Sequence, residues 1–234
     1  MSDARQNASA QGISAHGLRK DAGGRTLFQD IDLSVPPGSI YGLVGPPGSA
    51  KTAFLRVVAT LDQPDSGQLF ICGIPADTYP DEARKRLGYM PQTFIAYEGI
   101  TVEGYLDFYA LVQGISGRDR PAVRDALLEL LDLTALREEL AQELPLDQRQ
   151  RLNLARCLIH DPDVLLLDDP SAGMSEDGQS ALGATLLDLA GLRKTLLLTG
   201  RTEDFTSTVC DAVIRMPGAA SRTATIRTAQ ENPP

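Results

Sequence analysis

Short runs of consecutive apolar residues recur along the chain and predict strands whose two faces are both buried. Four such runs are Ser39–Val44, Val164–Leu167, Thr195–Thr199 and Ala212–Met216. Strands of this kind are typical of a parallel sheet that is covered by helices. Because helical segments lie between these runs, the pattern predicts an α/β fold.

The centre of the chain has a different pattern, in which apolar residues are spaced by three and four positions. This spacing predicts helices over Val102–Gln113, Pro121–Leu131, Thr134–Glu143 and Asp147–His160. We expect these segments to form a helical insert within the α/β domain. The segment Glu176–Leu192 is predicted to be a further helix that returns the chain to the sheet.

The two ends of the chain differ from the region between them. Residues 1–11 are small and polar, and we expect them to be disordered. Residues 218–234 are expected to contain one short strand followed by a loose tail. Within the region between these ends, the large apolar side chains of Met90, Phe94 and Phe108 and the leucines of the predicted helices are expected to lie in the core.

Composition narrows the possible functions. Hydrophobic residues make up 42% of the 234 positions, which is enough for a sizeable core, and 31 acidic against 22 basic residues give a net charge of -9. This acidic balance argues against nucleic acid as a partner, because nucleic-acid binding needs clustered Lys and Arg. Three scattered cysteines do not suit a disulfide framework or a zinc site, and a reduced, cytosolic compartment fits them. The sequence has no apolar run of the roughly 18 residues that a membrane span needs.

The segment Gly45-Pro-Pro-Gly-Ser-Ala-Lys-Thr52 follows a predicted strand and opens a predicted helix over Lys51–Leu61. Glycines let backbone N–H groups approach a phosphate closely, a Lys neutralises phosphate charge, and a Ser or Thr hydroxyl ligates Mg²⁺. The position before the lysine, usually glycine in such loops, is Ala50, so a simple Gly-Pro turn before a helix stays open as an alternative. The candidate phosphate-binding residues are Gly45, Gly48, Ser49, Ala50, Lys51 and Thr52.

Polar residues at the ends of two other predicted strands extend this site. Asp168 and Asp169 follow an apolar run directly, and ligands of α/β sheets bind at the carboxyl ends of the strands. An Asp in that place can hold Mg²⁺ directly or through water. The strand over Gly88–Gln92 ends in a glutamine. We therefore take Thr52 and Asp168 as candidate magnesium ligands.

In this order and spacing, these motifs resemble the nucleotide-binding subunit of ABC transporters, and most closely the drug- and antibiotic-exporter type. The resemblance covers about residues 12–217 and extends to Val35–Gly45, Asp65–Gly67, Gln150–Arg156 and Cys210-Asp211. It implies a P-loop NTPase core with a mainly parallel sheet, an antiparallel N-terminal β part and a helical subdomain at about 96–160. No Asn-Lys-x-Asp motif occurs, so a signalling GTPase is not favoured.

The resemblance also implies cofactors and partners. ATP and Mg²⁺ would bind at the phosphate loop, with Gln92 as a third magnesium ligand beside Thr52 and Asp168 and as a nucleotide-binding residue. The partners would be a membrane-spanning permease subunit and a second nucleotide-binding subunit, either the same chain or a different one. The protein would then be cytoplasmic and peripheral, at the cytoplasmic face of the membrane. The aromatic-rich segment Tyr97–Tyr109 would line the groove that receives the permease.

The sequence departs from the family at the signature segment, where Leu-Ser-Gly-Gly-Gln is expected. Leu144–Gln148 stands there, with Pro145 in place of the serine, and Leu146 and Asp147 in place of the glycines. We expect Asp147 to cap the following helix and to occupy the anion site that a partner's ATP would use. If Asp147 is instead a solvated cap, the glycine-based site is lost all the same.

Other departures affect catalysis and base binding. The catalytic Glu of the family aligns with Asp169, a weak candidate base, and the switch His aligns with Arg201, which is always charged and cannot accept a hydrogen bond. Arg201 could bind phosphate without relaying a proton, or it could be a surface arginine. An Asp expected in the D-loop aligns with Ser175, and the aromatic that stacks on adenine aligns with about Ala22.

Three functions follow from these residues. The first is an ATP-binding subunit of an ABC exporter with degenerate catalytic motifs and weak or absent hydrolysis. The second is a working ATPase subunit that energises export, possibly in a heterodimer. The third is a soluble binding module with no transporter. ATP turnover by the purified chain at rates typical of the family would exclude the first.

Overall fold

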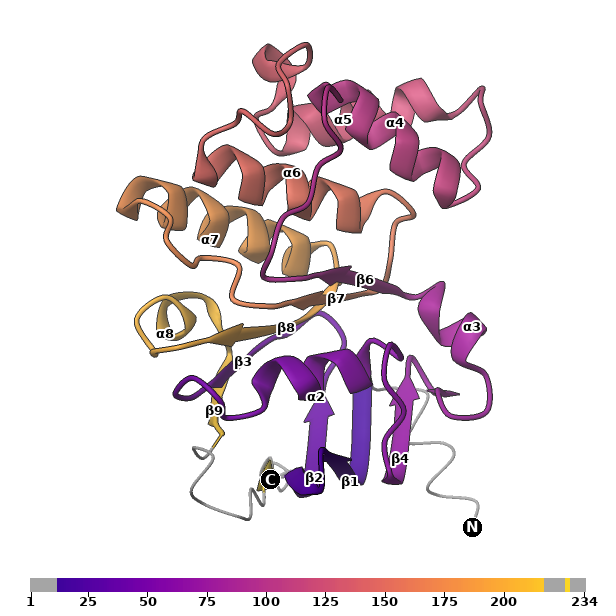
Figure 1. Cartoon of the computed structure of the whole chain (residues 1–234), viewed down its shortest axis with the longest axis vertical. Helices are drawn as coiled ribbons and strands as arrows, with labels where there is room; N and C mark the ends of the chain where they lie inside the picture. The colour runs from indigo at the N-terminus through magenta and orange to yellow at the C-terminus, as the bar shows by residue number, and fades with distance from the viewer. Residues whose placement is uncertain (1–11, 217–225, 228–234) are drawn as a thin grey trace.

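The computed structural model describes residues 12–216 and 226–227, which form two sheets and the helices around them (Figure 1). The first sheet has the strand order β10-β2-β1-β4-β5. Its central pairs β1–β2 and β1–β4 are antiparallel, whereas β10 runs parallel to β2. The strands are β1 (Ile13–Ala22), β2 (Arg25–Val35), β4 (Ser66–Ile71), β5 (Ile74–Pro75) and β10 (Ile226–Arg227).

The second sheet has the order β6-β7-β8-β3-β9, and all its strand pairs are parallel. The strands are β6 (Leu87–Met90), β7 (Val164–Leu167), β8 (Thr195–Gly200), β3 (Ile40–Val44) and β9 (Ala212–Arg215). Every residue of β7 and β8 is buried, as expected for a sheet that is covered on both faces. The predicted fold class, a mainly parallel sheet with an antiparallel N-terminal part, is confirmed.

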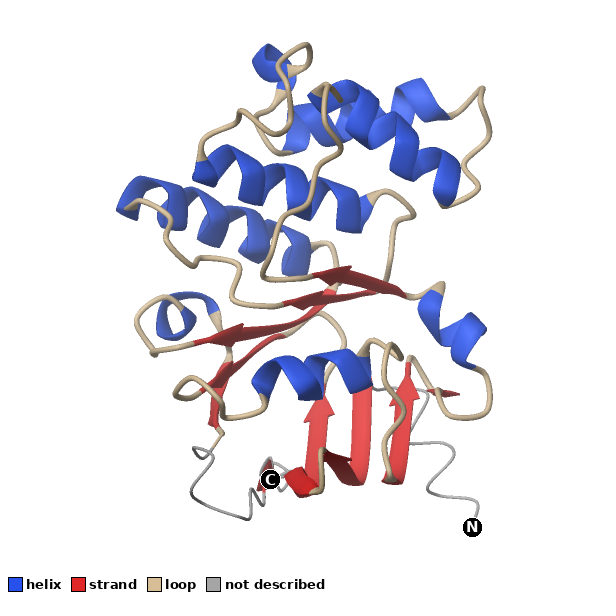
Figure 2. Ribbon diagram, in the orientation of Figure 1, coloured by secondary structure: helices blue, strands red, loops and turns tan. Residues whose placement is uncertain are grey.

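The helices form two groups. Figure 2 shows one helix between the two sheets and a larger group on the far side of the parallel sheet. The helix between the sheets is α2 (Lys51–Val58), and α3 (Pro80–Arg84) lies just before β6. The larger group consists of α4 (Val102–Val112), α5 (Arg120–Leu130), the 3₁₀ turn η1 (Thr134–Leu136), α6 (Leu146–Leu158), α7 (Glu176–Gly191) and α8 (Thr206–Val209).

The helix predicted over Thr134–Glu143 is wrong, because only η1 is helical in that range. The backbone of this segment is used elsewhere. The N–H of Val102 donates to the carbonyl of Glu139 (2.9 Å), and the N–H of Ala141 donates to the carbonyl of Ile100 (2.9 Å). The segment therefore satisfies groups at the start of α4 that no helix bond could satisfy.

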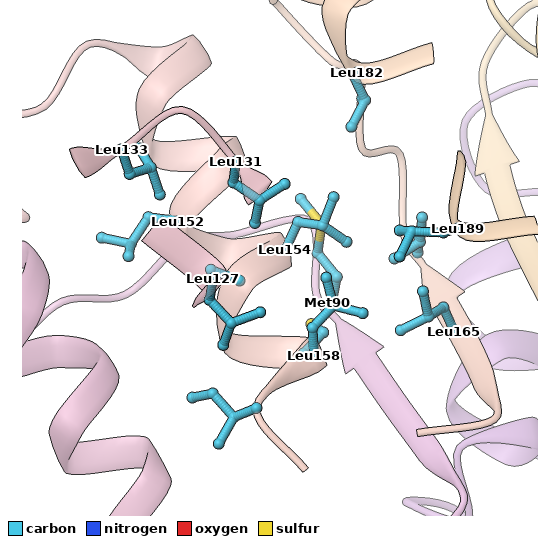
Figure 3. Close-up of a cluster of buried hydrophobic side chains, with 14 of the residues drawn as sticks. Met90, Leu127, Leu131, Leu133, Leu152, Leu154, Leu158, Leu165, Leu182 and Leu189 are labelled. Carbon is cyan, nitrogen blue, oxygen red and sulfur yellow. The ribbon is translucent and has the colours of Figure 1, made fainter. Parts of the chain in front are cut away.

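Strand β7 shares its side chains between two hydrophobic cores. Leu165 and Leu167 belong to the core beneath the helical group, whereas Val164 and Leu166 belong to the core that includes α2 and the antiparallel sheet. This alternation follows from the two-residue period of a strand. The first core is shown in Figure 3, where Leu165 lies near leucines of the helical layer.

Two of the side chains that were expected in the core have different environments. Met90 is buried at the end of β6, as predicted. Phe108 is 37% exposed on α4, so its assignment to the core is wrong. Its ring packs edge-on against Tyr97 (5.3 Å between centroids) and Tyr109 (5.1 Å), which places it at the margin of an aromatic cluster.

Candidate functional site

The phosphate loop links β3 to α2 and is organised around the amino group of Lys51. That group donates to the carbonyls of Gly45 (2.5 Å) and Pro46 (3.1 Å) and to the hydroxyl of Ser49 (2.9 Å). Gly45 has no room for a side chain, because a Cβ there would lie 2.5 Å from the Met216 carbonyl oxygen. The lysine thus lies inside the curve of the loop.

Ala50 is the residue immediately before α2 and has a left-handed backbone, with φ 61° and ψ 14°. This conformation is easy for glycine but brings the Cβ of other residues close to backbone atoms, at a cost of about 1–2 kcal/mol. The loop therefore keeps the shape that a glycine would give it. The alanine at this position is a source of strain at the start of α2.

Two aspartates, Asp168 and Asp169, follow β7 at the carboxyl ends of the parallel strands, and Thr199 of β8 contacts both of them. The Thr199 hydroxyl donates to Oδ1 of Asp168 (2.7 Å) and accepts from the backbone N–H of Asp169 (2.9 Å). All three residues are buried. Sequence reasoning missed Thr199, although a threonine at the end of an otherwise apolar strand is a signal that could have indicated it.

The carboxylate of Asp169 has two donors on the same oxygen. Gln92 donates to Oδ2 from its side-chain amide (3.2 Å), and Nε of Arg201 lies 3.3 Å from the same atom. Burial raises the pKa of Asp169 above its ordinary value, and the Arg201 charge opposes that shift. Arg201 itself stays 65% exposed at its side chain. The residue at the switch position thus forms an ion pair with the candidate base.

These groups line one pocket of about 410 Å³. Every predicted site residue except Gly45 lines it, and Gly45 contributes the carbonyl that accepts from Lys51. Burial lowers the pKa of Lys51, while Asp169 and Asp168 oppose the change. Leu27 of β2 also lines the pocket and was not foreseen from the sequence.

The proposed magnesium ligands can be tested for their chemical fit to that ion. Thr52, Gln92 and Asp168 line the same pocket and would offer a hydroxyl, an amide and a carboxylate oxygen. Thr199 engages Oδ1 of Asp168, and the donor that Gln92 gives to Asp169 is its amide nitrogen. Hard oxygen donors of this kind suit Mg²⁺, so the residues present fit the ion.

The signature segment does not have the predicted cap. Pro145 is the N-cap residue of α6 and makes no side-chain capping bond, so the expectation that Asp147 caps its own helix is wrong. The Asp147 carboxylate instead accepts from the backbone N–H of Ser175 (3.3 Å) and from its hydroxyl (2.5 Å). Ser175 in turn caps α7 by accepting from the N–H of Gly178 (3.0 Å). We call this pair the Asp147–Ser175 contact.

The position aligned with the adenine-stacking aromatic lies at the end of a hairpin. Ala22 pairs with Arg25 across the turn between β1 and β2, and it is exposed. Among the described residues that line the pocket, none is aromatic.

An exposed apolar patch lies on α4 and on the segment that precedes it. Tyr97, Ile100 and Phe108 line an open hollow of about 550 Å³ there. Ile95, in the segment before α4, and Leu111, on α4, are also large exposed apolar side chains. Among the residues that the structure describes, no helix combines the length and the apolar character that crossing a bilayer requires.

Comparison with known proteins places these features in a family. The family model described as ABC transporter matches residues 28–172. The chain is 32% identical over 199 residues to the Nod factor export ATP-binding protein I of Burkholderia orbicola, a match that covers 85% of this chain and 66% of that protein. It is 36% identical over 162 residues to the probable multidrug ABC transporter ATP-binding protein YbhF of Escherichia coli, a match that covers 69% of this chain and 28% of that protein. The chain thus spans less than two thirds of both relatives.

Solved structures share the fold. A dimeric structure of MJ0796, a bacterial ABC transporter cassette, matches with a TM-score of 0.78 and 20% identity over 88% of this chain and 94% of that one. A structure of the same cassette bound to ADP and Pi matches with a TM-score of 0.78 and 19% identity over 88% of this chain and 96% of that one. The family model covers well over half of the chain, and the chain therefore belongs to the ABC transporter family, with the fold of its ATP-binding subunits.

Proposed function

We propose that the protein is the ATP-binding subunit of an ABC exporter and that it binds Mg-ATP while hydrolysing it weakly or not at all. The groups suited to holding phosphate are in place, since the loop, Lys51 and the oxygen donors of Thr52 and Asp168 line one pocket. The names of the relatives, which refer to Nod factor export and multidrug transport, support the exporter type.

The main observation in support of weak hydrolysis is that Gln92 and Arg201 both contact the same oxygen of Asp169. A general base must accept a proton from the attacking water, and a permanently charged guanidinium at its oxygen stabilises the unprotonated form and weakens it as a base. Asp169 is also one methylene shorter than the expected glutamate. A displacement of about 1 Å in a reacting group can cost roughly a hundredfold in rate.

The Asp147–Ser175 contact supports the same proposal from a second site. In the family, the glycines of the signature segment receive the phosphates of a partner's ATP. Here a carboxylate stands among the first residues of α6, and it is tied to the start of α7. A like charge about 4 Å from a phosphate costs roughly 4 kcal/mol at an effective dielectric constant of 20.

A working ATPase is the second candidate, and one observation favours it. Burial raises the pKa of Asp169, and a base with a higher pKa accepts a proton more readily. Arg201 would then stabilise charge that develops on the phosphate. In this case the subunit would energise export itself, possibly in a heterodimer.

We also propose the partners of the subunit and the boundaries of its domains. The exposed patch around Tyr97 and Phe108 would receive a membrane-spanning permease subunit, and a second nucleotide-binding subunit would complete the dimer. The protein would act at the cytoplasmic face of a membrane. Residues 12–217 would form the nucleotide-binding domain with its helical subdomain at about 96–160, and the ends at 1–11 and 218–234 lie largely outside the described residues.

Calorimetric titration with Mg-ATP, paired with a phosphate-release assay, tests this function. Wild type should bind, and Lys51→Ala should weaken binding at least 100-fold because the main cation of the loop is removed. The matched control is Lys85→Ala, an exposed lysine outside the pocket, which should bind as wild type does. Phosphate release by wild type should stay within about threefold of Asp169→Asn. A large loss of turnover in Asp169→Asn would instead establish the working ATPase.

A further inference from the structure

The nucleotide pocket has two chemically different ends. Two candidate magnesium ligands, Gln92 and Asp168, and the candidate base Asp169 lie at the carboxyl ends of the parallel strands, where the metal and the terminal phosphate would be. Leu27 enters the same pocket from β2, which belongs to the antiparallel sheet below α2 in Figure 1. If the metal and the terminal phosphate lie at the first end, with the phosphate loop between, the nucleoside must extend toward Leu27.

The Leu27 end offers a base little to bind. Leu27 is 39% exposed, and the other apolar lining residues are Pro47, Ala50 and Ala53. The charged and hydrogen-bonding side chains of the pocket belong to the phosphate loop and the start of α2, or to the ends of the parallel strands. The polar neighbours of Leu27 along β2, Arg25 and Thr26, do not line the pocket.

Base recognition requires hydrogen bonds to base edges or an aromatic face. Discrimination is strong only where a site has polar groups that a wrong substrate leaves unpaired. Stacking on an aromatic ring strengthens binding roughly 5- to 150-fold, as judged from the loss when the ring is replaced with alanine. Leu27 supplies neither of these and gives only apolar contact, which is equally available to every base.

We propose that the pocket recognises the magnesium triphosphate and not the base, so that it accepts purine and pyrimidine nucleoside triphosphates alike, with Leu27 as a non-selective apolar contact to the base. This inference rests on the proposed function, because it assigns the substrate class of the same site. Affinity then comes from Lys51, the loop N–H groups and the metal ligands.

Competition calorimetry with Mg-ATP, Mg-GTP, Mg-CTP, Mg-UTP and magnesium tripolyphosphate tests the proposal on the full chain. The four nucleotides should have dissociation constants within about threefold of one another, and tripolyphosphate should bind within about tenfold of ATP. ATP binding more than 20-fold tighter than CTP would overturn the inference and leave the proposed function standing. No binding of any of the five ligands would overturn both.

Two substitutions at Leu27 test its place at the base end. Leu27→Tyr adds an aromatic face to an exposed strand position and should tighten ATP and GTP at least fivefold without changing tripolyphosphate. Leu27→Ala should weaken all four nucleotides equally and leave tripolyphosphate unchanged. Leu187→Tyr, which alters an exposed leucine of α7, is the control and should change none of these constants. Equal shifts for tripolyphosphate and nucleotides would remove Leu27 from the base end.

Discussion

Replacing Ala50 with glycine relieves the backbone strain in the phosphate loop. Ala50 has φ 61° and precedes α2 directly, so its Cβ stands where the left-handed conformation disfavours one. Glycine removes about 1–2 kcal/mol of this strain. It also raises the entropy of the unfolded chain, which costs about 0.4–1 kcal/mol. The difference leaves Ala50→Gly more stable than wild type by about 1 kcal/mol.

Urea and thermal unfolding measure this change. A gain of about 1 kcal/mol corresponds to roughly 2–4 °C in melting temperature for a chain of this size. Ala50 also lines the pocket, so the loss of its methyl group should let a phosphate approach the loop more closely and tighten Mg-ATP binding. If Ala50→Gly is less stable than wild type, the left-handed strain does not limit the stability of this loop.

Ala53→Gly is the matched control, because it makes the same change three residues later. Ala53 lies within α2, where glycine costs about 1 kcal/mol relative to alanine. The two substitutions should therefore shift stability in opposite directions. Equal destabilisation by both would mean that helix propensity, and not the left-handed conformation, governs position 50.

Two further predictions concern titration and ion pairing. Burial raises the folded pKa of Asp169 above its ordinary 3.8, so the stability it contributes is full below that pH and is lost as pH rises through the raised value. Asp169→Asn should therefore gain stability relative to wild type as pH rises above about 4. The gain should be about 1.4 kcal/mol for every tenfold difference in proton affinity between the folded and the unfolded carboxyl group. Urea titrations between about pH 3.5 and 7 measure it. Arg124→Met should destabilise the protein by no more than about 1 kcal/mol, because the Arg124 side chain is only 16% exposed and lies 2.9 Å from both Asp107 and Asp125, but both carboxylates are open to solvent. Thermal melts should show this loss shrinking in about 1 M salt, and an unchanged melting temperature would contradict the role of the pair.

The parts of the fold that sequence could predict are those in which side-chain period and burial agree. β7 is apolar at every position and is buried on both faces, so its run of four residues was sufficient to identify it. The helix predicted for the segment after α5 was wrong for the opposite reason. Its apolar spacing resembles a helix, but its backbone groups pair with residues 100–103, and a pairing between distant segments leaves no local pattern.

The residues of the candidate site also divide into those that the sequence could predict and those that it could not. The phosphate loop and the two aspartates are contiguous motifs, and the sequence located them. Thr199 and Leu27 enter the pocket from β8 and β2, so only the folded sheets bring them to the loop. The Asp147–Ser175 contact joins residues 28 positions apart, and helix-capping rules applied to α6 alone led to the wrong partner.

Under the proposed function, Arg201 would link nucleotide binding and cleavage through the charge of the pocket. Among the described residues that line it, Lys51 and Arg201 are cationic and Asp168 and Asp169 are anionic, so their formal charges cancel. A neutral histidine at position 201 would leave the same pocket with one net negative charge, which would disfavour an approaching triphosphate. Under the proposed function, the arginine would favour phosphate, while its ion pair opposes the rise that burial gives to the pKa of Asp169, the candidate base. A single guanidinium would then shift this site toward holding a nucleotide and away from cleaving it.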